Sequence, residues 1–189
     1  HYNFVVALLN DLFGIQSRGG CSCAGPYGHD LLELDEDKSN KYIMELSCGN
    51  VGSKPGWVRL TFNYFIPKEE FDFILECINW IADNGWKLLN LYFFNDQEGL
   101  WNCKLKKEVA INSLDSLLSQ KSTLSKGTSK DRSKMRKQYL KFADKLAKKE
   151  LAKMKAKEFQ EYKYNQIDNP LRWYSLVQDV DGINEKRAR

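Results

Sequence analysis

The sequence predicts an α+β fold, in which a small domain is extended by a long charged helix. Apolar residues recur at helical spacing in residues 1–13 and 67–81, and they fall at every second position in residues 57–66. Near residue 110 the composition changes, and sequence rich in lysine and serine follows. With 189 residues, 42% of them apolar, the chain can bury a sizeable core.

The first element is expected to be a helix over residues 1–13, ended by Gly14. Residues 15–17 form an extended link to residues 18–29, whose sequence is Arg-Gly-Gly-Cys-Ser-Cys-Ala-Gly-Pro-Tyr-Gly-His. These glycines and the proline suit neither a packed helix nor a strand. We therefore expect a shaped loop that presents the thiols of Cys21 and Cys23.

The middle of the domain is expected to contain a helix between shorter elements. A short helical piece runs to Leu34, and the acidic residues 35–40 form a surface connection. Residues 57–66 are the clearest strand, with Val58, Leu60, Phe62, Tyr64 and Ile66 on one face and Arg59 on the other. Pro67 then opens a helix that ends at Asn84-Gly85 and buries Phe71, Ile74, Leu75, Ile78 and Ile81.

The rest of the chain completes the predicted organisation. Residues 88–94 and 100–105 are expected to be short strands joined by the turn 95–99. We expect a small domain over 1–110, a flexible linker over 111–130, a charged helix over 131–162, and a C-terminal strand and tail over 163–189. Within the charged helix, Met135, Tyr139, Phe142 and Leu146 are spaced by four, three and four residues.

Charge is distributed unevenly along the chain. Residues 121–157 contain 14 Lys or Arg and 3 Asp or Glu, a net charge of +11, while the remainder carries −7. This basic segment could bind nucleic acid or an acidic partner by releasing counterions. Lysine runs without arginine or interleaved aromatic residues carry little specificity, so we expect a solvated lysine-rich helix or insertion and no nucleic-acid binding.

The sequence also bears on the compartment. No window of 18 uncharged apolar residues exists, and the opening segment lacks the basic start of a secretory signal, so neither a membrane span nor export is expected. The five cysteines are odd in number and do not resemble a disulfide framework, which favours the cytoplasm. Because the chain opens with His1 inside a helix, we expect it to be a piece of a larger protein.

A Cys-x-Cys pair can bind a metal, form a strained disulfide or supply a nucleophile. The nearest further metal ligands, His29 and Cys48, are not at a compact spacing from the pair, so no metal site is expected. A nearby arginine and the backbone N–H groups of a glycine loop favour a thiolate. The residues alone leave a reactive thiol and a tight turn that merely contains cysteines equally open.

The loop carries a resemblance to a known family. Residues Arg18 to Pro26 fit, in register, the pattern Arg-x-Gly-x-x-Cys-Ala-x-Pro. This pattern resembles the active-site loop of class V aminotransferase-type enzymes that use pyridoxal phosphate, which include cysteine desulfurases and selenocysteine lyases. The segment Gly56-Trp57-Val58-Arg59-Leu60 is similar to the strand that follows in that family. The resemblance covers residues 1–105 and implies the small C-terminal domain of a fold-type I enzyme, a short sheet packed with helices.

The resemblance also implies roles for individual residues. Cys23 matches the cysteine that attacks the sulfur of a cysteine substrate and becomes a persulfide. Arg59 matches the arginine that binds the substrate carboxylate, and Arg18 matches the one that positions the substrate or the loop. Cys21 stands where better-known desulfurases carry histidine, and it is a possible accessory residue. His29 is another, although a surface role is expected for it.

The resemblance implies that the cofactor is held mainly by a domain that precedes this chain in sequence. The Schiff-base lysine and the phosphate cradle of the family belong to a large N-terminal domain, and Lys38, Lys41, Lys54 and Lys87 fall in no comparable motif. We therefore expect this chain alone to be inactive and the intact protein to be a homodimer that passes sulfur to an acceptor. The alternatives to a cysteine desulfurase are an aminotransferase or another lyase of the same family, and a catalytically silent relative whose basic segment binds nucleic acid or an acidic partner.

The remaining cysteines and the tryptophans are expected to be structural. Cys77 lies in the second long helix and is interpreted as a core residue, and Cys48 and Cys103 as core or near-surface residues. The same interpretation applies to Trp57, Trp80, Trp86 and Trp101.

Overall fold

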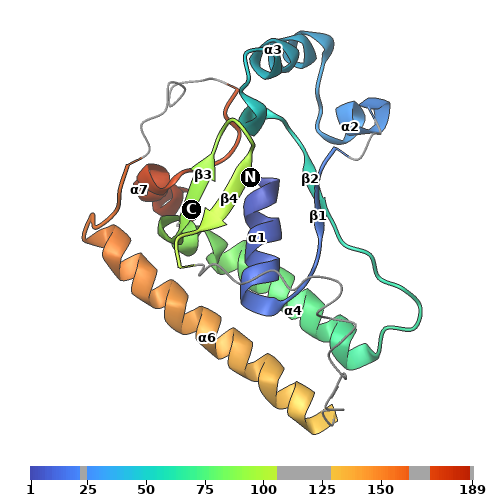
Figure 1. Cartoon of the computed structure of the whole chain (residues 1–189), viewed down its shortest axis with the longest axis vertical. Coiled ribbons are helices and arrows are strands. Elements are labelled where there is room, and N and C mark those ends of the chain that lie inside the picture. The colour runs from blue at the N-terminus through green and yellow to red at the C-terminus, as the bar shows by residue number, and fades with distance from the viewer. Residues whose placement is uncertain (22–24, 106–128, 162–170, 188–189) are drawn as a thin grey trace, which may run out of the picture.

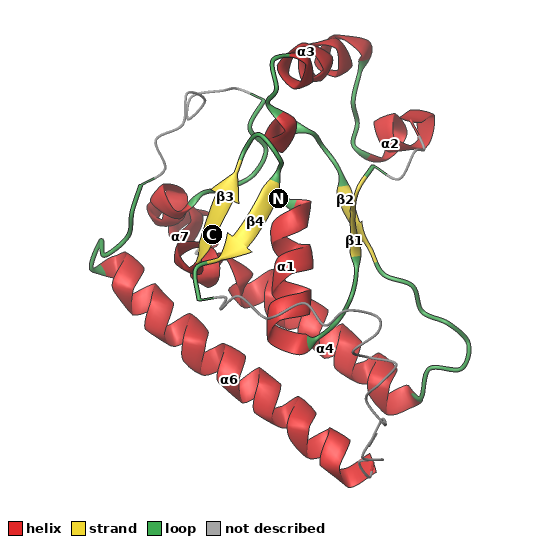
Figure 2. Cartoon of the chain, in the orientation of Figure 1, coloured by secondary structure: helices red, strands yellow, loops and turns green. Residues whose placement is uncertain are grey.

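The computed structural model describes residues 1–21, 25–105, 129–161 and 171–187 (Figure 1). The structure is α+β, with helices around two separate two-stranded antiparallel sheets (Figure 2). The predicted fold class is therefore confirmed at this level. The boundary predicted at residue 110 and most of the predicted linker, residues 111–128, lie outside the described residues.

Helix α1 (Tyr2–Phe13) lies at the centre of the structure (Figure 1). Its buried residues are Tyr2, Phe4, Leu8, Leu9, Leu12 and Phe13. Gly14 ends the helix in a left-handed conformation, with φ of 67°, and its N–H donates to the carbonyl oxygens of Leu9 and Asn10. The predicted helix and its end are both confirmed.

Helix α4 (Lys68–Asn84) follows Pro67, which is the N-cap. The predicted buried face is wrong in part, because Phe71 and Leu75 are exposed and the buried residues are Cys77, Trp80 and Ile81. This face of α4 packs against both α1 and α6 (Ser129–Lys155). Trp80 Nε1 donates a hydrogen bond to the Asp144 carboxylate of α6 at 2.7 Å.

Gly85 does not end α4 in the expected left-handed conformation. It is right-handed and begins the 3₁₀ helix η2 (Gly85–Leu91). A Cβ atom at Gly85 would lie 3.0 Å from Leu8 Cδ1, so a larger residue here would require the Leu8 side chain to shift by a few tenths of an ångström.

Each of the two sheets is a short antiparallel pair of strands. In the first, β1 (Arg18–Gly20) pairs with β2 (Trp57–Arg59), and in the second, β3 (Tyr92–Asn95) pairs with β4 (Leu100–Cys103). The strand predicted over 57–66 ends at Arg59, because β1 offers only three residues to pair with. The first predicted strand of the second pair, 88–94, begins only at Tyr92, since residues up to 91 belong to η2.

Three short elements lie between β1 and β2: α2 (Gly25–Leu31), α3 (Glu36–Ser47) and the 3₁₀ helix η1 (Val51–Ser53). The interpretation of residues 35–40 as a connection is wrong, since they begin α3. Asp35 caps this helix by accepting from the Lys38 N–H at 2.7 Å, and Glu36 and Asp37 favour the positive end of its dipole.

Helix α6 (Ser129–Lys155) confirms the predicted charged helix, although it ends seven residues before the predicted boundary. Of the large apolar residues whose spacing the sequence showed, Met135, Tyr139 and Phe142 are exposed. The buried face consists of Ala143, Ala147, Glu150 and Met154. Its small alanine side chains let α6 approach η2 closely.

Glu150 is a buried carboxylate on α6, with 1% of its surface exposed. Its two oxygens accept hydrogen bonds from Asn90 Nδ2 of η2 at 3.0 Å and from Lys153 Nζ at 2.8 Å. Both bonds satisfy the buried carboxylate and fix the position of α6 along η2.

The C-terminal segment returns to the folded part, as predicted, but not as a strand. Residues 171–176 are irregular and lead into η3 (Val177–Asp179) and α7 (Val180–Arg187). Leu176 and Val177 are buried in the core that contains α1 and α6. Arg172 pairs with Asp179, whose carboxylate also accepts from the Leu176 N–H and so shapes the turn into η3.

The close contact between α6 and η2 predicts a specific sensitivity to side-chain volume. Ala147→Leu should lower the free energy of unfolding by about 1–3 kcal/mol, because the larger side chain must push α6 away from the core. Urea denaturation followed by circular dichroism measures the change.

Ala152→Leu is the matched control, since residue 152 is exposed on the same helix. It should change stability by less than about 0.5 kcal/mol. Equal losses in the two variants would show that the alanine face is not closely packed.

Candidate functional site

The two arginines singled out in the sequence lie directly opposite each other. In the antiparallel register, Arg18 of β1 pairs with Arg59 of β2, Gly19 with Val58, and Gly20 with Trp57. Directly opposed residues of a ladder project on the same side, with their Cβ atoms about 5 Å apart. The structure therefore brings Arg18 and Arg59 together on one face, although 40 residues separate them in the sequence.

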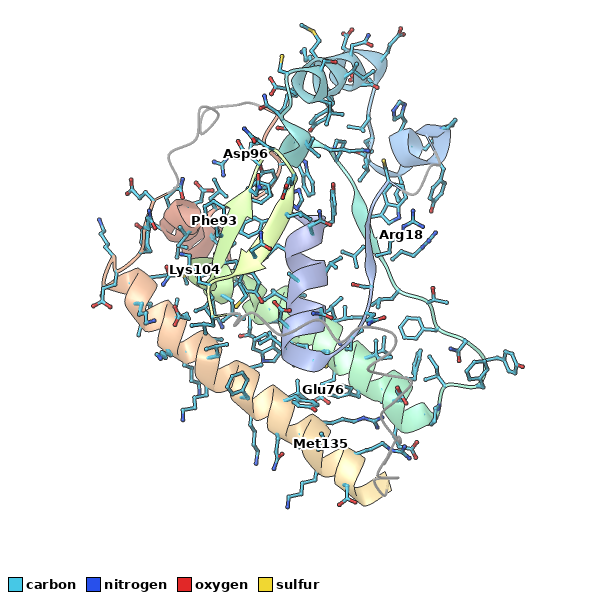
Figure 3. The ribbon with its side chains drawn as sticks, viewed as in Figure 1. Arg18, Glu76, Phe93, Asp96, Lys104 and Met135 are labelled. Carbon is cyan, nitrogen blue, oxygen red and sulfur yellow. The ribbon has the colours of Figure 1, made fainter. Side chains whose placement is uncertain are left out.

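This face points to the outside of the structure. Gly19 and Val58 occupy the opposite face of the ladder, where Val58 packs against the core. Both arginine residues are exposed, and Figure 3 shows Arg18 on the side of the ladder away from α1. The two arginine side chains thus leave the same exposed face of the ladder from directly opposed positions.

Tyr2 at the start of α1 fixes the position of the ladder. A Cβ atom at Gly19 would lie 2.7 Å from Tyr2 Cδ2, and one at Gly56 would lie 2.8 Å from Tyr2 Cε1. Only glycine allows the backbone this close to the ring at both positions. The Tyr2 ring also lies next to the His1 ring, at a centroid distance of 4.4 Å, and stacks with Trp173 of the C-terminal segment at 5.9 Å.

Trp57 shares the outer face with the arginines and is covered by α2. Its ring lies 3.3 Å from the position that a Cβ atom of Gly28 would take, and Tyr27 meets it edge-on at a centroid distance of 6.1 Å. The tryptophan therefore forms one wall beside the arginine pair. Sequence reasoning treated Trp57 as a structural residue and missed its place next to the site.

The arginine pair has no neutralising partner within the described part of the chain. Neither Arg18 nor Arg59 makes an ion pair or a side-chain hydrogen bond there. Like charges at directly opposed positions of a ladder repel each other. An anion bound between the two guanidinium groups would remove this repulsion, so the pair is suited to a carboxylate or phosphate.

Cys21 and His29 line a second feature next to the ladder. They border a cavity of about 150 Å³ between the end of β1, α2 and α3, together with Ser39, Tyr42 and Lys54. His29 Nε2 lies 3.4 Å from Ser39 Oγ, and the imidazole is exposed. The expected surface role of His29 agrees with this position.

The contribution of α3 to this cavity was missed by sequence reasoning. Tyr42 donates its hydroxyl to the Leu171 carbonyl at 3.2 Å, and burial raises the pKa of Tyr42. The capping residue Asp35, followed by two acidic residues, was a signal that could have revealed the helix.

The cysteines differ in their surroundings. Cys23 lies outside the described residues, so its position relative to the arginine pair stays a prediction. Cys48 is exposed, whereas Cys77 is buried against α1, and burial, with the Glu76 carboxylate adding to it, raises the pKa of Cys77 to about 12. The interpretation of Cys77 as a core residue is confirmed.

No group of three or more His, Cys, Asp or Glu side chains in the described ranges is placed to hold a metal ion. Among these same ranges, no helix is both long enough and apolar enough to cross a membrane.

Comparisons with known proteins identify no relative: no family model, no curated protein and no solved structure matches this chain.

The exposure and pKa of each thiol predict the order in which the cysteines react with a thiol reagent. With 5,5′-dithiobis(2-nitrobenzoate) near pH 8, Cys48 should react within the first phase, because its thiol is exposed. Cys77 should react only after unfolding, since its raised pKa leaves almost no thiolate and its sulfur is buried. Mass spectrometry of the labelled peptides assigns the order.

Cys48→Ser serves as the control, because it should remove the labelling of residue 48 from the first phase and leave the protection of Cys77 unchanged. Labelling of Cys77 in the native protein at the rate of Cys48 would contradict the described packing of α4 on α1.

Proposed function

We propose that this chain forms the substrate-binding part of a pyridoxal-phosphate-dependent enzyme of the class V aminotransferase type, acting on a cysteine-like amino acid. The observation that supports this proposal is the pair Arg18 and Arg59, which are directly opposed on the outer face of β1 and β2 and have no ion-pair partner among the described residues. The sequence pattern of the loop from Arg18 to Pro26 supplies the family and the reaction type.

The role of the two arginines is to bind and orient the carboxylate of the substrate. A guanidinium group donates two parallel hydrogen bonds to a carboxylate, and a second guanidinium group adds charge and fixes the direction of approach. The rigid position of the ladder on Tyr2 keeps the pair in place, so little ordering is needed on binding.

The described residues fit the substrate carboxylate better than they fit the cofactor itself. Lys54 borders only the cavity of about 150 Å³, which is smaller than the ~300 Å³ of a small ligand pocket, and Lys87 donates to Asn84 Oδ1. Lys38 and Lys41 are exposed on α3. Pyridoxal phosphate, when bound, supplies the electron sink for bond cleavage, and the lysine that would hold it is not assigned to this chain.

Cys23 has the proposed role of nucleophile. Its thiolate attacks the substrate sulfur, the bond between that sulfur and the substrate Cβ breaks, and the electron pair of the broken bond stays on the substrate, which the electron sink of a bound cofactor would allow. The sulfur remains on Cys23 as a persulfide for transfer to an acceptor. An aminotransferase or another lyase of the same type would use the arginine pair without needing this thiol. The requirement for Cys23 therefore separates the desulfurase from the alternatives.

Carboxylate binding can be measured on this chain directly. In nuclear magnetic resonance spectra of the ¹⁵N-labelled protein, L-cysteine should shift the amide signals of residues 18–20 and 57–59, whereas its methyl ester should not. Arg59→Gln should raise the dissociation constant for L-cysteine, obtained by titrating these shifts, about tenfold or more, since one bidentate contact is lost.

Lys41→Gln is the matched control, because it removes one exposed positive charge on α3 and should leave the shifts unchanged. Equal shifts with the acid and the ester, or equal effects of the two substitutions, would overturn carboxylate binding by the arginine pair.

The nucleophile can be tested in the intact enzyme that contains this chain. Cys23→Ser should abolish sulfide release from L-cysteine, because serine cannot form the persulfide. Cys21→Ser and Cys48→Ser should keep most of the activity. Sulfide release that survives Cys23→Ser would reject the assigned nucleophile, and loss in Cys21→Ser alone would move the role to Cys21.

A further inference from the structure

Lysines form one stripe along the outer side of α6. We define this lysine stripe as Lys134, Lys137, Lys141, Lys145, Lys148 and Lys155, all of them exposed. Their separations of three, four, four, three and seven residues place them on one face of the helix over about 30 Å. Figure 3 shows long side chains extending from α6 away from the rest of the structure.

The lysine stripe is not neutralised within the described residues. None of its members makes an ion pair there, in contrast to Arg136 and Lys153 of the same helix, which pair with Glu70 at 3.5 Å and with Glu150 at 2.8 Å. Like charges three and four residues apart on a helix repel each other. A partner with a matching row of negative charges would relieve this repulsion.

An apolar pocket lies beside the stripe. Phe142, which is 58% exposed, and Leu146 form one wall of a cavity of about 270 Å³, and Leu88, Leu91 and Leu105 form much of the rest. Lys145 of the stripe and Lys149 each follow one of the two wall residues of α6 by three positions, so on the helix surface each is a neighbour of a wall residue. Positive charge and a concave apolar surface are thus contiguous.

The combination distinguishes between kinds of anionic partner. A membrane surface does not enter a concave pocket, and a nucleic acid would gain little from leucine walls or from a stripe without arginine. An amphipathic helix with acidic residues on one side can place a bulky apolar side chain in the pocket and its carboxylates on the lysines. We propose that α6 binds an acidic amphipathic helix of another protein, through the lysine stripe and this pocket.

The proposal can be tested by fluorescence anisotropy with the full chain and a labelled synthetic peptide. The peptide is helical, with glutamate on one face and leucine on the adjoining face, and a second peptide carries glutamine in place of glutamate. We expect binding of the glutamate peptide only, weakened about tenfold as NaCl rises from roughly 0.05 to 0.3 M.

Variants locate the binding surface. The double substitution Lys145→Glu and Lys149→Glu should weaken binding about tenfold or more, and Phe142→Ala should weaken it several-fold without unfolding the protein, because that side chain is largely exposed. Lys38→Glu with Lys41→Glu on α3 makes the same change in net charge and should leave binding within about twofold.

Three results would overturn the proposal. The first is no binding of the glutamate peptide, and the second is equal weakening by the α3 control, which would show a response to net charge alone. The third is tighter binding of phosphatidylserine vesicles or of duplex RNA than of the peptide, with that binding lost in the Lys145→Glu and Lys149→Glu variant. Success or failure here leaves carboxylate binding by Arg18 and Arg59 untouched, since the two surfaces share no residue.

Discussion

Burial of the apolar residues of α1 is the constraint on which the rest of the structure depends. This one helix contacts β1, β2, β4, α4 and α6, so elements from every part of the described chain meet on it. Leu8 and Leu9 are almost completely buried, and Leu8 packs closely against Gly85 at the start of η2. An isolated ladder of three residue pairs is marginal in water, so β1 and β2 owe their position to this helix.

The sequence predicted which segments form helices better than it predicted which side of each helix is buried. Periodicity gave α1, α4 and α6, because an amphipathic helix is a local pattern. The spacing of Met135, Tyr139, Phe142 and Leu146 did not reveal the buried face of α6, because that face depends on the partner: the alanines at 143 and 147 give a weak apolar signal but are buried against the core. The large side chain of Phe142 is mostly exposed.

The candidate site was predictable only in part. Alternation in the sequence placed Arg59 on the less apolar face of a strand, and the loop pattern drew attention to Arg18. Their pairing depends on which segments become neighbours, and no local pattern contains that information. The strand stopped at Arg59 because its antiparallel partner β1 begins only at Arg18, the residue opposite Arg59, whereas the alternating sequence continued to Ile66.

Tyr2 contacts parts of the chain that are far apart in sequence. One side of its ring accepts the glycine backbones that carry the arginine pair, and its neighbour on another side is Trp173, whose indole donates to the Ser53 carbonyl. The ring of His1 lies against both Tyr2 and Trp173, so residues from the two ends of the chain form one aromatic cluster behind the strands that carry Arg18 and Arg59. Loss of the Trp173 ring would therefore remove packing beneath β1 and β2, although more than 100 residues separate Trp173 from either strand.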